Sequence, residues 1–427
     1  MSSGYKVSTI VMSSGERLPM LLGADGLPMF EPTVFALSEI RARNLASNTI
    51  ESYLRSVMVL LLFLGLRKID IEGRLNDGRL LSLGEIEELT RFCRLPMERI
   101  QAMCDVAENL LGKIAPVASL EKLRMRSSKM TDREVSSAAA ATRLRNIRDY
   151  IRWLGSNRMS RHGVSVAFRS SLESSVHEVV DAIDARLPSD GHYLIEQREG
   201  LAPKVVDRIL KVVDPRSSGN PWHDEHCRYR NELIILWLLY LGLRKGELLN
   251  IRISDIDFRQ STVTVARRAD DISDPRRNQP KVKTRGREIP ISTALLDKTN
   301  AYIMNLRAGI HGARKHDFLF VSEDKGLPMS VPSLAKIFNV LRNKCPDLPK
   351  NIFPHIFRHT WNDRFSEEMD AKRVGAETEK KARSFLMGWS ETSGTAATYT
   401  RRHIKKKAAK ASLQLQESLM RVKNKDE

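Results

Sequence analysis

A turn-rich segment, Pro188-Ser189-Asp190-Gly191, separates two halves of the chain that differ in charge. Residues 1–199 carry 27 Lys and Arg against 25 Asp and Glu, whereas residues 200–427 carry 43 against 27. A length of 427 residues also exceeds what one hydrophobic core usually supports. We therefore predict two domains joined by a linker at 188–200.

The surplus of basic residues indicates a polyanionic partner. The formal net charge of the chain is +18, almost all of it in the second half, and a field of that sign attracts nucleic acids. Residues 121–169 form a second basic segment, with twelve Lys and Arg against four acids. DNA is the leading candidate partner, and RNA or a merely solvated basic surface are the alternatives.

Composition and cysteine placement exclude several classes of protein. A hydrophobic fraction of 41% is too high for a wholly disordered chain. The longest apolar run, 57–66, stops at Arg67 before it is long enough to span a membrane, and the N-terminus lacks the basic-then-apolar layout that we expect of a signal peptide. The four cysteines lack CxxC spacing, so we expect a cytoplasmic protein without a disulfide or zinc scaffold.

The first half has a short arm followed by helical patterns. Residues 1–33 form the arm, in which strand-like segments at 6–12 and 18–22 flank the turn signal Ser13-Ser14-Gly15 and predict a hairpin. Residues 34–187 then show apolar repeats of helical period, bounded by capping residues such as those at 47–49. We predict an all-helical domain here, with helices near 50–64, 83 onward, 98–111, 138–154 and 171–187.

The second half mixes helices with a few short strands. Residues 201–411 form the second domain, with strands at 262–265 and 287–291 and a strongly apolar helix that ends at Gly242. Residues 412–427 form a tail that carries an apolar stripe on a predicted helix. The predicted fold class is mainly α with a small antiparallel β-sheet. Further helices are predicted at 203–213, 231–241, 292–308, 331–342, 355–368 and 377–387.

Four fragments of the second domain carry residues suited to phosphate chemistry. Taken singly, each is weak, because an arginine at a helix start or a lysine on a hairpin is usually a solvated or packing residue. His355 and Arg358, at i and i+3, share one helix face and can converge on one ligand. The fragments are YLGLRKGELL at 240–249, KVKTRGREIP at 281–290, PHIFRHT at 354–360, and LMGWS at 386–390 followed by TY at 398–399.

Together and in this order, the fragments resemble the tyrosine recombinase (phage integrase) family over roughly residues 200–427. A weaker resemblance covers 34–155, where Asn48-Thr49-Ile50 followed by Tyr53 is similar to the family's helical DNA core-binding domain. The resemblance implies that domain at the N-terminal side, followed by an α+β catalytic domain. It also implies DNA strand breakage and rejoining.

The resemblance assigns the main catalytic roles. Arg244 and Arg358 would neutralise charge on the phosphate with planar bidentate forks, which a lysine cannot replace. Tyr399 would be the nucleophile, forming a 3′-phosphotyrosyl bond and freeing a 5′-hydroxyl. Lys283 would protonate the leaving oxygen, with Lys281 as the competing candidate.

The remaining site residues also follow from the resemblance. His355 would act as a base or hydrogen-bond donor, Trp389 fills the family's second His/Trp position, and Glu247 would orient its neighbours. No cofactor is implied, and the cluster of His223, His226 and Cys227 has no fourth ligand in view, so we predict no metal site. The candidate DNA-binding residues are Arg145, Arg148, Arg152, Lys281, Arg285 and Arg287.

Two segments depart from the family pattern. Residues 266–280 form a long polar loop, and the interval 367–381 holds an acidic and basic insertion. The insertion either remodels a loop near the DNA or a partner or, as we favour, is a solvated excursion. The leading function is an integrase or transposition recombinase of a mobile element that acts without metal or ATP. It would bind inverted sites on double-stranded DNA as a homotetramer, with the tail docking into a neighbour and accessory recombination proteins as further partners.

Other functions stay open from the sequence. A topoisomerase-like DNA relaxer uses a similar site without pairing two duplexes, and chromosome-dimer resolution uses the same chemistry. A non-catalytic accessory factor derived from a recombinase belongs to a different class. Loss of Tyr399 or of either arginine would favour that class, and all three residues are present.

Overall fold

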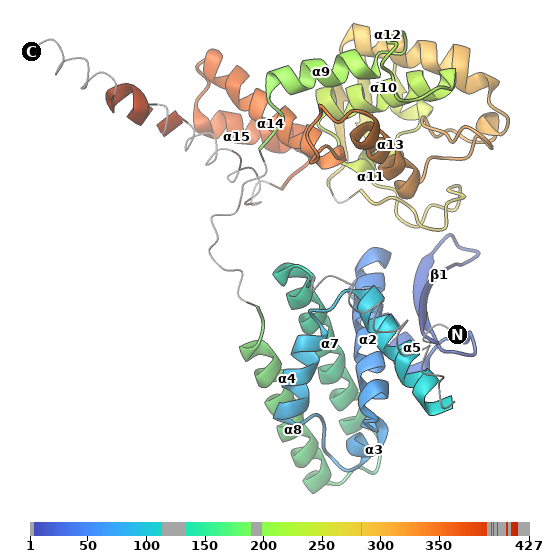
Figure 1. Cartoon of the computed structure of the whole chain (residues 1–427), viewed down its shortest axis with the longest axis vertical. Coiled ribbons are helices and arrows are strands. Elements are labelled where there is room, and N and C mark those ends of the chain that lie inside the picture. Colours follow the sequence, from blue (N-terminus) through green and yellow to red (C-terminus); the bar gives the residue numbers. More distant parts are fainter. Residues whose placement is uncertain are drawn as a thin grey trace, which may run out of the picture. The chain divides into compact units, whose positions relative to one another are not determined.

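The computed structural model describes residues 4–112, 134–188, 199–282 and 284–390, and then 394, 396, 399, 407–408 and 411–416. Contacts divide the chain into two compact units, Met1–Tyr193 and Leu194–Glu427 (Figure 1). The division falls within the predicted linker. The predicted fold class, mainly α with a small antiparallel sheet, is confirmed, and the N-terminal hairpin adds a second small sheet.

Unit 1 begins with two strands that are built into its core. β1 (Lys6–Val11) and β2 (Arg17–Leu22) pair antiparallel, with Lys6 opposite Leu22. Leu18 and Leu21 of β2 are buried in the same core as the helices, so this segment is part of the domain and not a separate arm. The helical segments of the unit are α1 (Phe30–Phe35), the π-helical Ala36–Arg41, α2 (Ser47–Arg67), α3 (Ile71–Asn76), α4 (Leu83–Phe92), α5 (Met97–Gly112), α7 (Ser137–Met159) and α8 (Val166–Ala185).

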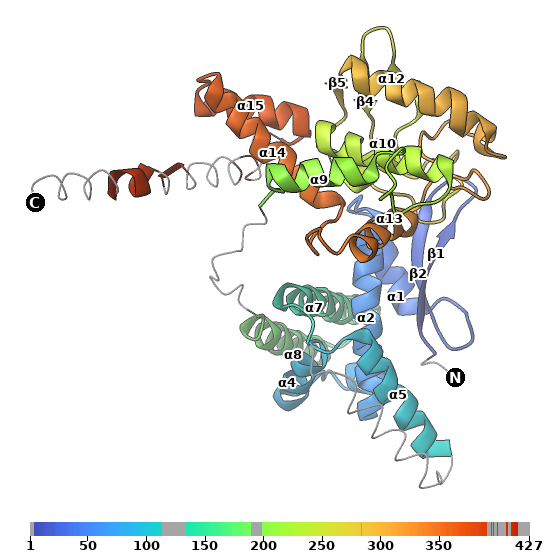
Figure 2. The same ribbon diagram turned by 45° about the horizontal axis from the view of Figure 1, so that its top comes forward.

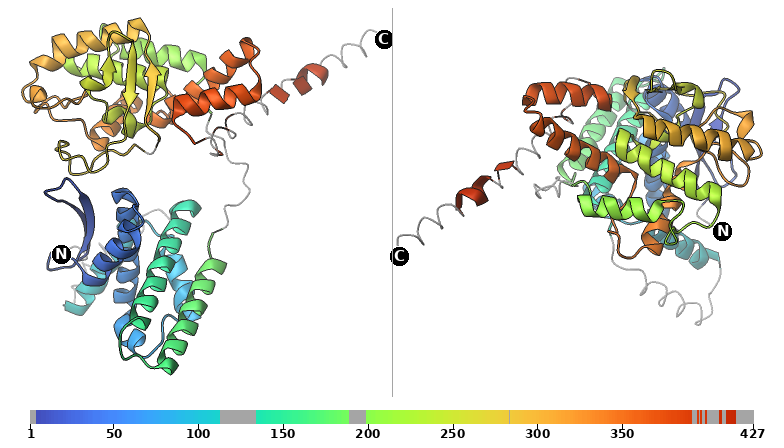
Figure 3. Two further views of the ribbon diagram at one scale, coloured as in Figure 1. Left: turned by 180° about the vertical axis from the view of Figure 1, so that it is seen from behind. Right: turned by 90° about the horizontal axis from the view of Figure 1, so that it is seen from above.

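Helix α2 is the centre of this unit. Ile50, Leu54 and Val57 on α2 are completely buried, and the helix contacts β2, α5 and α7. Judged by length and composition alone, it is the one helix among the described residues that could cross a membrane. Its packing in the core accounts for that apolar character. Helices α7 and α8 lie side by side (Figure 3).

Unit 2 surrounds the apolar helix α10 (Glu225–Leu241), on which Ile234, Trp237 and Leu238 are completely buried. A three-stranded antiparallel sheet in the order β3-β4-β5 contributes Val263 and Ile289 to the same core (Figure 2). The other elements are α9 (Pro203–Val213), α11 (Lys245–Leu249), β3 (Ile256–Asp257), β4 (Thr262–Val265), β5 (Arg287–Pro290), α12 (Thr293–Ala301), α13 (Val331–Lys344), α14 (Pro354–Ala371), α15 (Ala376–Met387), the π-helical Tyr302–Leu306, and 3-10 turns at Ile253–Asp255, Arg307–Gly309 and Ala313–Lys315.

The prediction of a solvated excursion at 367–381 is wrong in one respect. These residues form the end of α14, a short turn and the start of α15, which packs against α14 and β5. Glu379 on α15 is only 4% exposed, so the insertion is partly a packed element and not wholly a solvated loop. Of the predicted tail helix, residues 412–416 are helical and exposed, and the rest lies outside the described residues.

Candidate active site

Arg358 is fixed in the interior of unit 2 by two main-chain carbonyls. Its Nη1 donates to the Gly242 carbonyl at 2.7 Å, and its Nη2 donates to the Met387 carbonyl at 3.2 Å. Gly242 ends α10 in a left-handed conformation with φ of 60°, and a Cβ there would lie 2.9 Å from the Trp361 ring. The glycine in the Leu-Gly-Leu-Arg fragment is therefore needed to bring the ends of α10 and α15 to this arginine.

Glu247 is the counter-charge for three arginines. Its carboxylate accepts from the Arg244 backbone N–H at 3.0 Å, the Arg287 guanidinium at 2.9 Å and the Thr284 hydroxyl at 2.7 Å. The Arg244 guanidinium lies 3.3 Å away and that of Arg358 3.8 Å away. Three guanidinium groups thus share one carboxylate. This surplus of positive charge favours an anionic ligand.

The electrostatics of this cluster reflect its burial. Burial alone would raise the pKa of Glu247, but the charges of Arg287 and Arg358 outweigh it and lower that pKa to about 2. Burial and the neighbouring Arg244 lower the pKa of Arg358. The carboxylate is therefore ionised at neutral pH. Arg358 shares the one carboxylate of Glu247 with two other arginines, so a bound phosphate would stabilise its charged form.

The Tyr399 hydroxyl lies 2.9 Å from Nδ1 of His359. The tyrosine ring stacks on Trp389 with centroids 5.6 Å apart, and the Arg358 guanidinium lies 5.2 Å from the Trp389 ring. Burial raises the pKa of Tyr399, although the charges of Arg358 and Arg244 partly offset this. The phenol is therefore protonated at neutral pH, and its attack on a phosphate requires a base.

His359 is a site residue whose role the sequence did not assign. The resemblance gives the base or donor role to His355, but the side chain that reaches the Tyr399 hydroxyl is that of His359. His355 is exposed, and its ring lies edge-on to His359 with centroids 4.6 Å apart. The signal was available, because His359 follows Arg358 directly and lies one helical turn after His355.

The residues around Lys281, here called the lysine segment, pack against α11, the helix that follows Arg244. A Cβ at Gly246 would lie 2.2 Å from the Lys281 carbonyl oxygen, so only glycine permits this approach of α11. Lys281 is half-buried, whereas Lys283 lies outside the described residues. The structure thus places the lysine-bearing backbone beside α11 and leaves the choice between the two lysines as a prediction.

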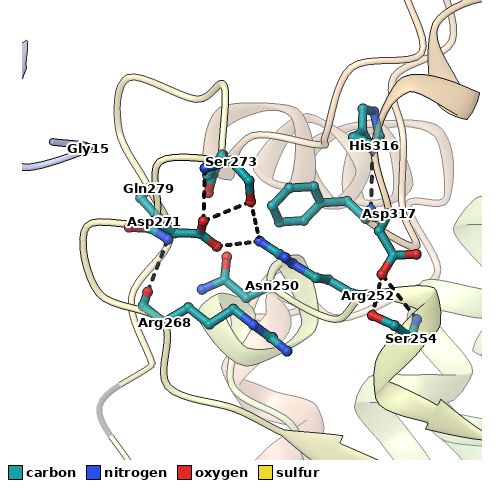
Figure 4. Close-up of polar contacts among 12 residues, drawn as sticks. Gly15, Asn250, Arg252, Ser254, Arg268, Asp271, Ser273, Gln279, His316 and Asp317 are labelled. Atoms are coloured by element: carbon teal, nitrogen blue, oxygen red, sulfur yellow. Dashed lines mark hydrogen bonds and ion pairs between the residues drawn. The ribbon is translucent and has the colours of Figure 1, made fainter. Parts of the chain in front are cut away.

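The long loop at 266–280 is organised by ion pairs and by a buried arginine, Arg276. Arg276 donates to the carbonyls of Leu249 and Met329, both at 2.9 Å, and to the Asn250 side chain at 2.8 Å. Asn250 in turn donates to the Pro280 carbonyl, next to Lys281. Figure 4 shows Asn250 beside the ion pair of Arg252 with Asp271 on this loop. The loop therefore fixes the lysine segment to the end of α11.

The predicted DNA-binding arginines of unit 1 differ in how exposed they are. Arg145 and Arg152 are exposed on α7, with Arg152 at 3.7 Å from Asp149. Arg148 is half-buried and paired with both Asp149 and Asp184, at 2.8 and 2.5 Å. Because two carboxylates already neutralise Arg148, it is less suited than Arg145 to contact a DNA phosphate.

In unit 2, one of the predicted DNA-binding residues is in the interior. The side chain of Arg285 is exposed, but that of Arg287 is only 2% exposed and is paired with Glu247. Assigning Arg287 to a DNA surface is therefore wrong. It is a buried counter-charge that links β5 to α11 and, through the Leu386 carbonyl at 2.6 Å, to α15.

A possible metal cluster lies near the start of α10. The ligand atoms of Asp224, His226 and Cys227 are within 4.8 Å of one another. Asp224 caps α10, His226 contacts the Tyr302 hydroxyl, and the guanidinium of Arg230 donates to the Cys227 sulfur at 3.2 Å. A cation would face this positive charge, so the cluster offers poor conditions for a metal.

Comparisons with known proteins identify the domain that holds this site. Residues 199–405 match the model of the phage integrase family. A tyrosine recombinase of Pseudothermotoga lettingae is 25% identical over 218 residues, which are 51% of this chain and 66% of the relative, slightly less than two thirds of its length.

Solved structures also show some likeness. The XerA recombinase is 18% identical over 63% of this chain and 82% of its own, with a TM-score of 0.36. The Tn1549 transposon integrase in complex with circular intermediate DNA is 17% identical over 75% and 94%, with a TM-score of 0.41. The match to the family model is the decisive one: residues 199–405 of this chain, with the arginine, histidine and tyrosine cluster that they contain, belong to the phage integrase family.

Proposed function

We propose that this protein is a site-specific DNA recombinase that cuts and rejoins double-stranded DNA through a covalent bond between Tyr399 and a 3′-phosphate. One observation carries the proposal. A buried tyrosine hydroxyl lies against a histidine nitrogen, beside three arginines that share a single carboxylate. A phosphodiester supplies both the missing negative charge and the electrophile for the tyrosine.

The chemistry can be assigned to groups of this chain. Arg244 and Arg358 bind the non-bridging oxygens, His359 takes the phenol proton, and the Tyr399 oxygen attacks phosphorus. The bond from phosphorus to the 5′-oxygen breaks, and that oxygen leaves as a hydroxyl after it receives a proton from Lys283. The phosphotyrosyl ester conserves the bond energy, so a 5′-hydroxyl of another strand can reverse the reaction without ATP.

Trp389 has a further use in this scheme. Its indole N–H is buried and has no acceptor among the described residues. A buried donor of this kind costs free energy unless a ligand satisfies it, and a phosphate oxygen would do so. We propose that Trp389 donates to the phosphate while it also supports the tyrosine ring.

The wider function follows the family. We propose that the protein is the integrase or transposition recombinase of a mobile element in the cytoplasm, acting on inverted sites as a homotetramer. The helical unit 1 would also bind DNA, and the tail from residue 412 would dock into a neighbouring protomer. Apolar Leu413 and Leu415 are exposed on the described part of that tail, which supports a docking role.

The decisive experiment is a covalent trap. A duplex from the ends of the element that carries the gene is nicked near the expected cleavage point, mixed with full-length protein in EDTA and quenched with SDS. We expect a protein–DNA adduct that survives denaturation. Tight binding without an adduct on any end sequence would contradict the proposal and favour a non-catalytic accessory factor. Relaxation of supercoiled DNA without strand exchange would indicate a DNA relaxer.

DNA contact by Arg285 gives a separate prediction. Arg285→Ala removes an exposed charge next to the lysine segment, so DNA binding should weaken for all sequences. The slope of log K against log salt should fall by about one. Fluorescence anisotropy across a salt series measures this. Arg314→Ala, which removes an exposed arginine of the segment after α12, is the matched control, and an equal effect of both changes would contradict a specific contact.

A further inference from the structure

A buried ion pair lies next to the nucleophile, on the part of α15 that precedes the fragment at 386–390. Arg383 on α15 is completely buried and pairs with Glu379, one turn earlier, which is 4% exposed. The hydroxyl of Ser366 on α14 accepts from Arg383 and donates to Glu379 at 2.8 Å. The pair therefore connects α15 to α14, the helix that carries His359 and Arg358.

The Arg383 guanidinium faces two aromatic rings. It lies 5.4 Å from the centroid of Phe365 and 5.9 Å from that of Tyr399, within the range of a cation–π contact. Its Nε and Nη1 are buried and have no hydrogen-bond partner among the described residues. The pair thus holds the cation against the tyrosine ring, although two of its nitrogens have no partner in the part of the chain that the structure describes.

Packing alone does not explain an arginine here. A buried guanidinium with unsatisfied N–H groups costs free energy, and an apolar side chain of similar volume would fill the space without that cost. Burial accordingly lowers the pKa of Arg383, an effect that Glu379 only partly offsets. An unsatisfied polar group in the interior calls for a functional reason, and the nearest reactive group is Tyr399.

We propose that Arg383 is a positioning residue for the nucleophile, with its guanidinium fixed by Glu379 and Ser366 so that it holds the Tyr399 ring and favours the charge that develops on the phenol oxygen. The inference rests on the proposed function of Tyr399 and goes beyond it. It gives Glu379, which lies in the insertion at 367–381, a role in the reaction through Arg383.

The other charges around Tyr399 are fixed by their own partners. His359 and Arg358 face it from α14, and Arg244 faces it from the start of α11. Glu247 neutralises part of the charge of Arg244 and Arg358. From α15 come Arg383 and its counter-charge Glu379. Because Glu379 is the charged partner of Arg383, a change at either residue alters the charge that faces the phenol, and the two changes act in opposite directions.

Two variants should act in opposite directions. Arg383→Met keeps most of the volume and removes the cation, so cleavage should slow by about tenfold near neutral pH and recover as the pH rises. Glu379→Gln keeps the hydrogen-bond acceptor and removes the opposing charge, so the rate profile should move toward lower pH. Arg383→Lys should restore a large part of the rate, because a cation returns to the site.

The experiment measures single-turnover cleavage of the nicked duplex by full-length protein over the neutral and mildly alkaline range. Circular dichroism and DNA binding show whether each variant is folded, and Lys381→Met, at an exposed position on the same helix, is the matched surface control. If folded Arg383→Met cleaves like the wild type at every pH, the inference is overturned. If it does not fold, a Glu379→Gln profile identical to that of the wild type overturns it instead. Absence of cleavage by the wild type would contradict the proposed function, a distinguishable result.

Discussion

Tyr399→Phe is expected to abolish DNA cleavage while DNA binding is retained. The phenylalanine ring keeps the stacking on Trp389 and loses only the hydroxyl that would attack phosphorus. Since no other side chain can replace a nucleophile at that position, the cleavage rate should fall by at least about 10⁴-fold. Loss of the contact to His359 should lower the free energy of unfolding by only about 1 kcal/mol.

The chain offers a matched control for this change. Tyr302 is also buried, and its hydroxyl lies 3.1 Å from Nε2 of His226, a contact that involves none of the residues of the site. Tyr302→Phe removes a tyrosine hydroxyl from a histidine in the same way, so it should have a similar small effect on stability and should leave cleavage intact. Cleavage that survives in Tyr399→Phe, measured by adduct formation under single-turnover conditions, would contradict the assignment of the nucleophile.

Glu247→Ala is expected to be the most destabilising single change at the site. The carboxylate is buried, and its removal leaves the guanidinium groups of Arg287 and Arg358 in the interior without their counter-charge. Breaking a buried ion pair in this way costs about 3–5 kcal/mol. Denaturant unfolding monitored by circular dichroism measures this loss. Glu85→Ala in unit 1 is the control, because that carboxylate pairs with Arg74 nearer the surface and should cost less.

The same carboxylate predicts a pH dependence. The pKa of Glu247 is about 2 in the folded protein, below its ordinary value of 4.5. A folded-state pKa below the unfolded one stabilises the protein above pH 4.5, and this contribution is lost as the pH falls toward 2. Glu247→Gln should therefore flatten the dependence of stability on pH in that window. A variant that keeps the wild-type slope there would contradict the role of Glu247 as the shared counter-charge.

Much of the site could be predicted from the order of short fragments. Arg244, Arg358, Trp389 and Tyr399 are far apart in sequence, and the structure brings them together around Glu247 and His359. The fragment at 240–249 works as a predictor because it contains residues that a particular backbone geometry requires, as Gly242 shows at the end of α10.

The parts that could not be predicted depend on tertiary burial. Glu379 and Arg383 are spaced i and i+4 within a polar segment, a pattern that usually indicates a solvated helix face. Arg287 alternates with other charges on a strand, and nothing in the sequence distinguishes it from the exposed Arg285. Only the packing of α15 against α14 and β5 shows that Arg383 and Arg287 are interior. Likewise, the apolar residues of β2 do not reveal by themselves that the hairpin joins the helical core.

The most direct test of the account is to identify the atoms that join protein and DNA. The trapped adduct is digested with protease and nuclease, and the cross-linked peptide is sequenced by mass spectrometry. We expect a nucleotide on the hydroxyl of Tyr399, attached through its 3′-phosphate, and a free 5′-hydroxyl on the released strand. A nucleotide on any other residue, or a link through a 5′-phosphate, would contradict the proposed chemistry.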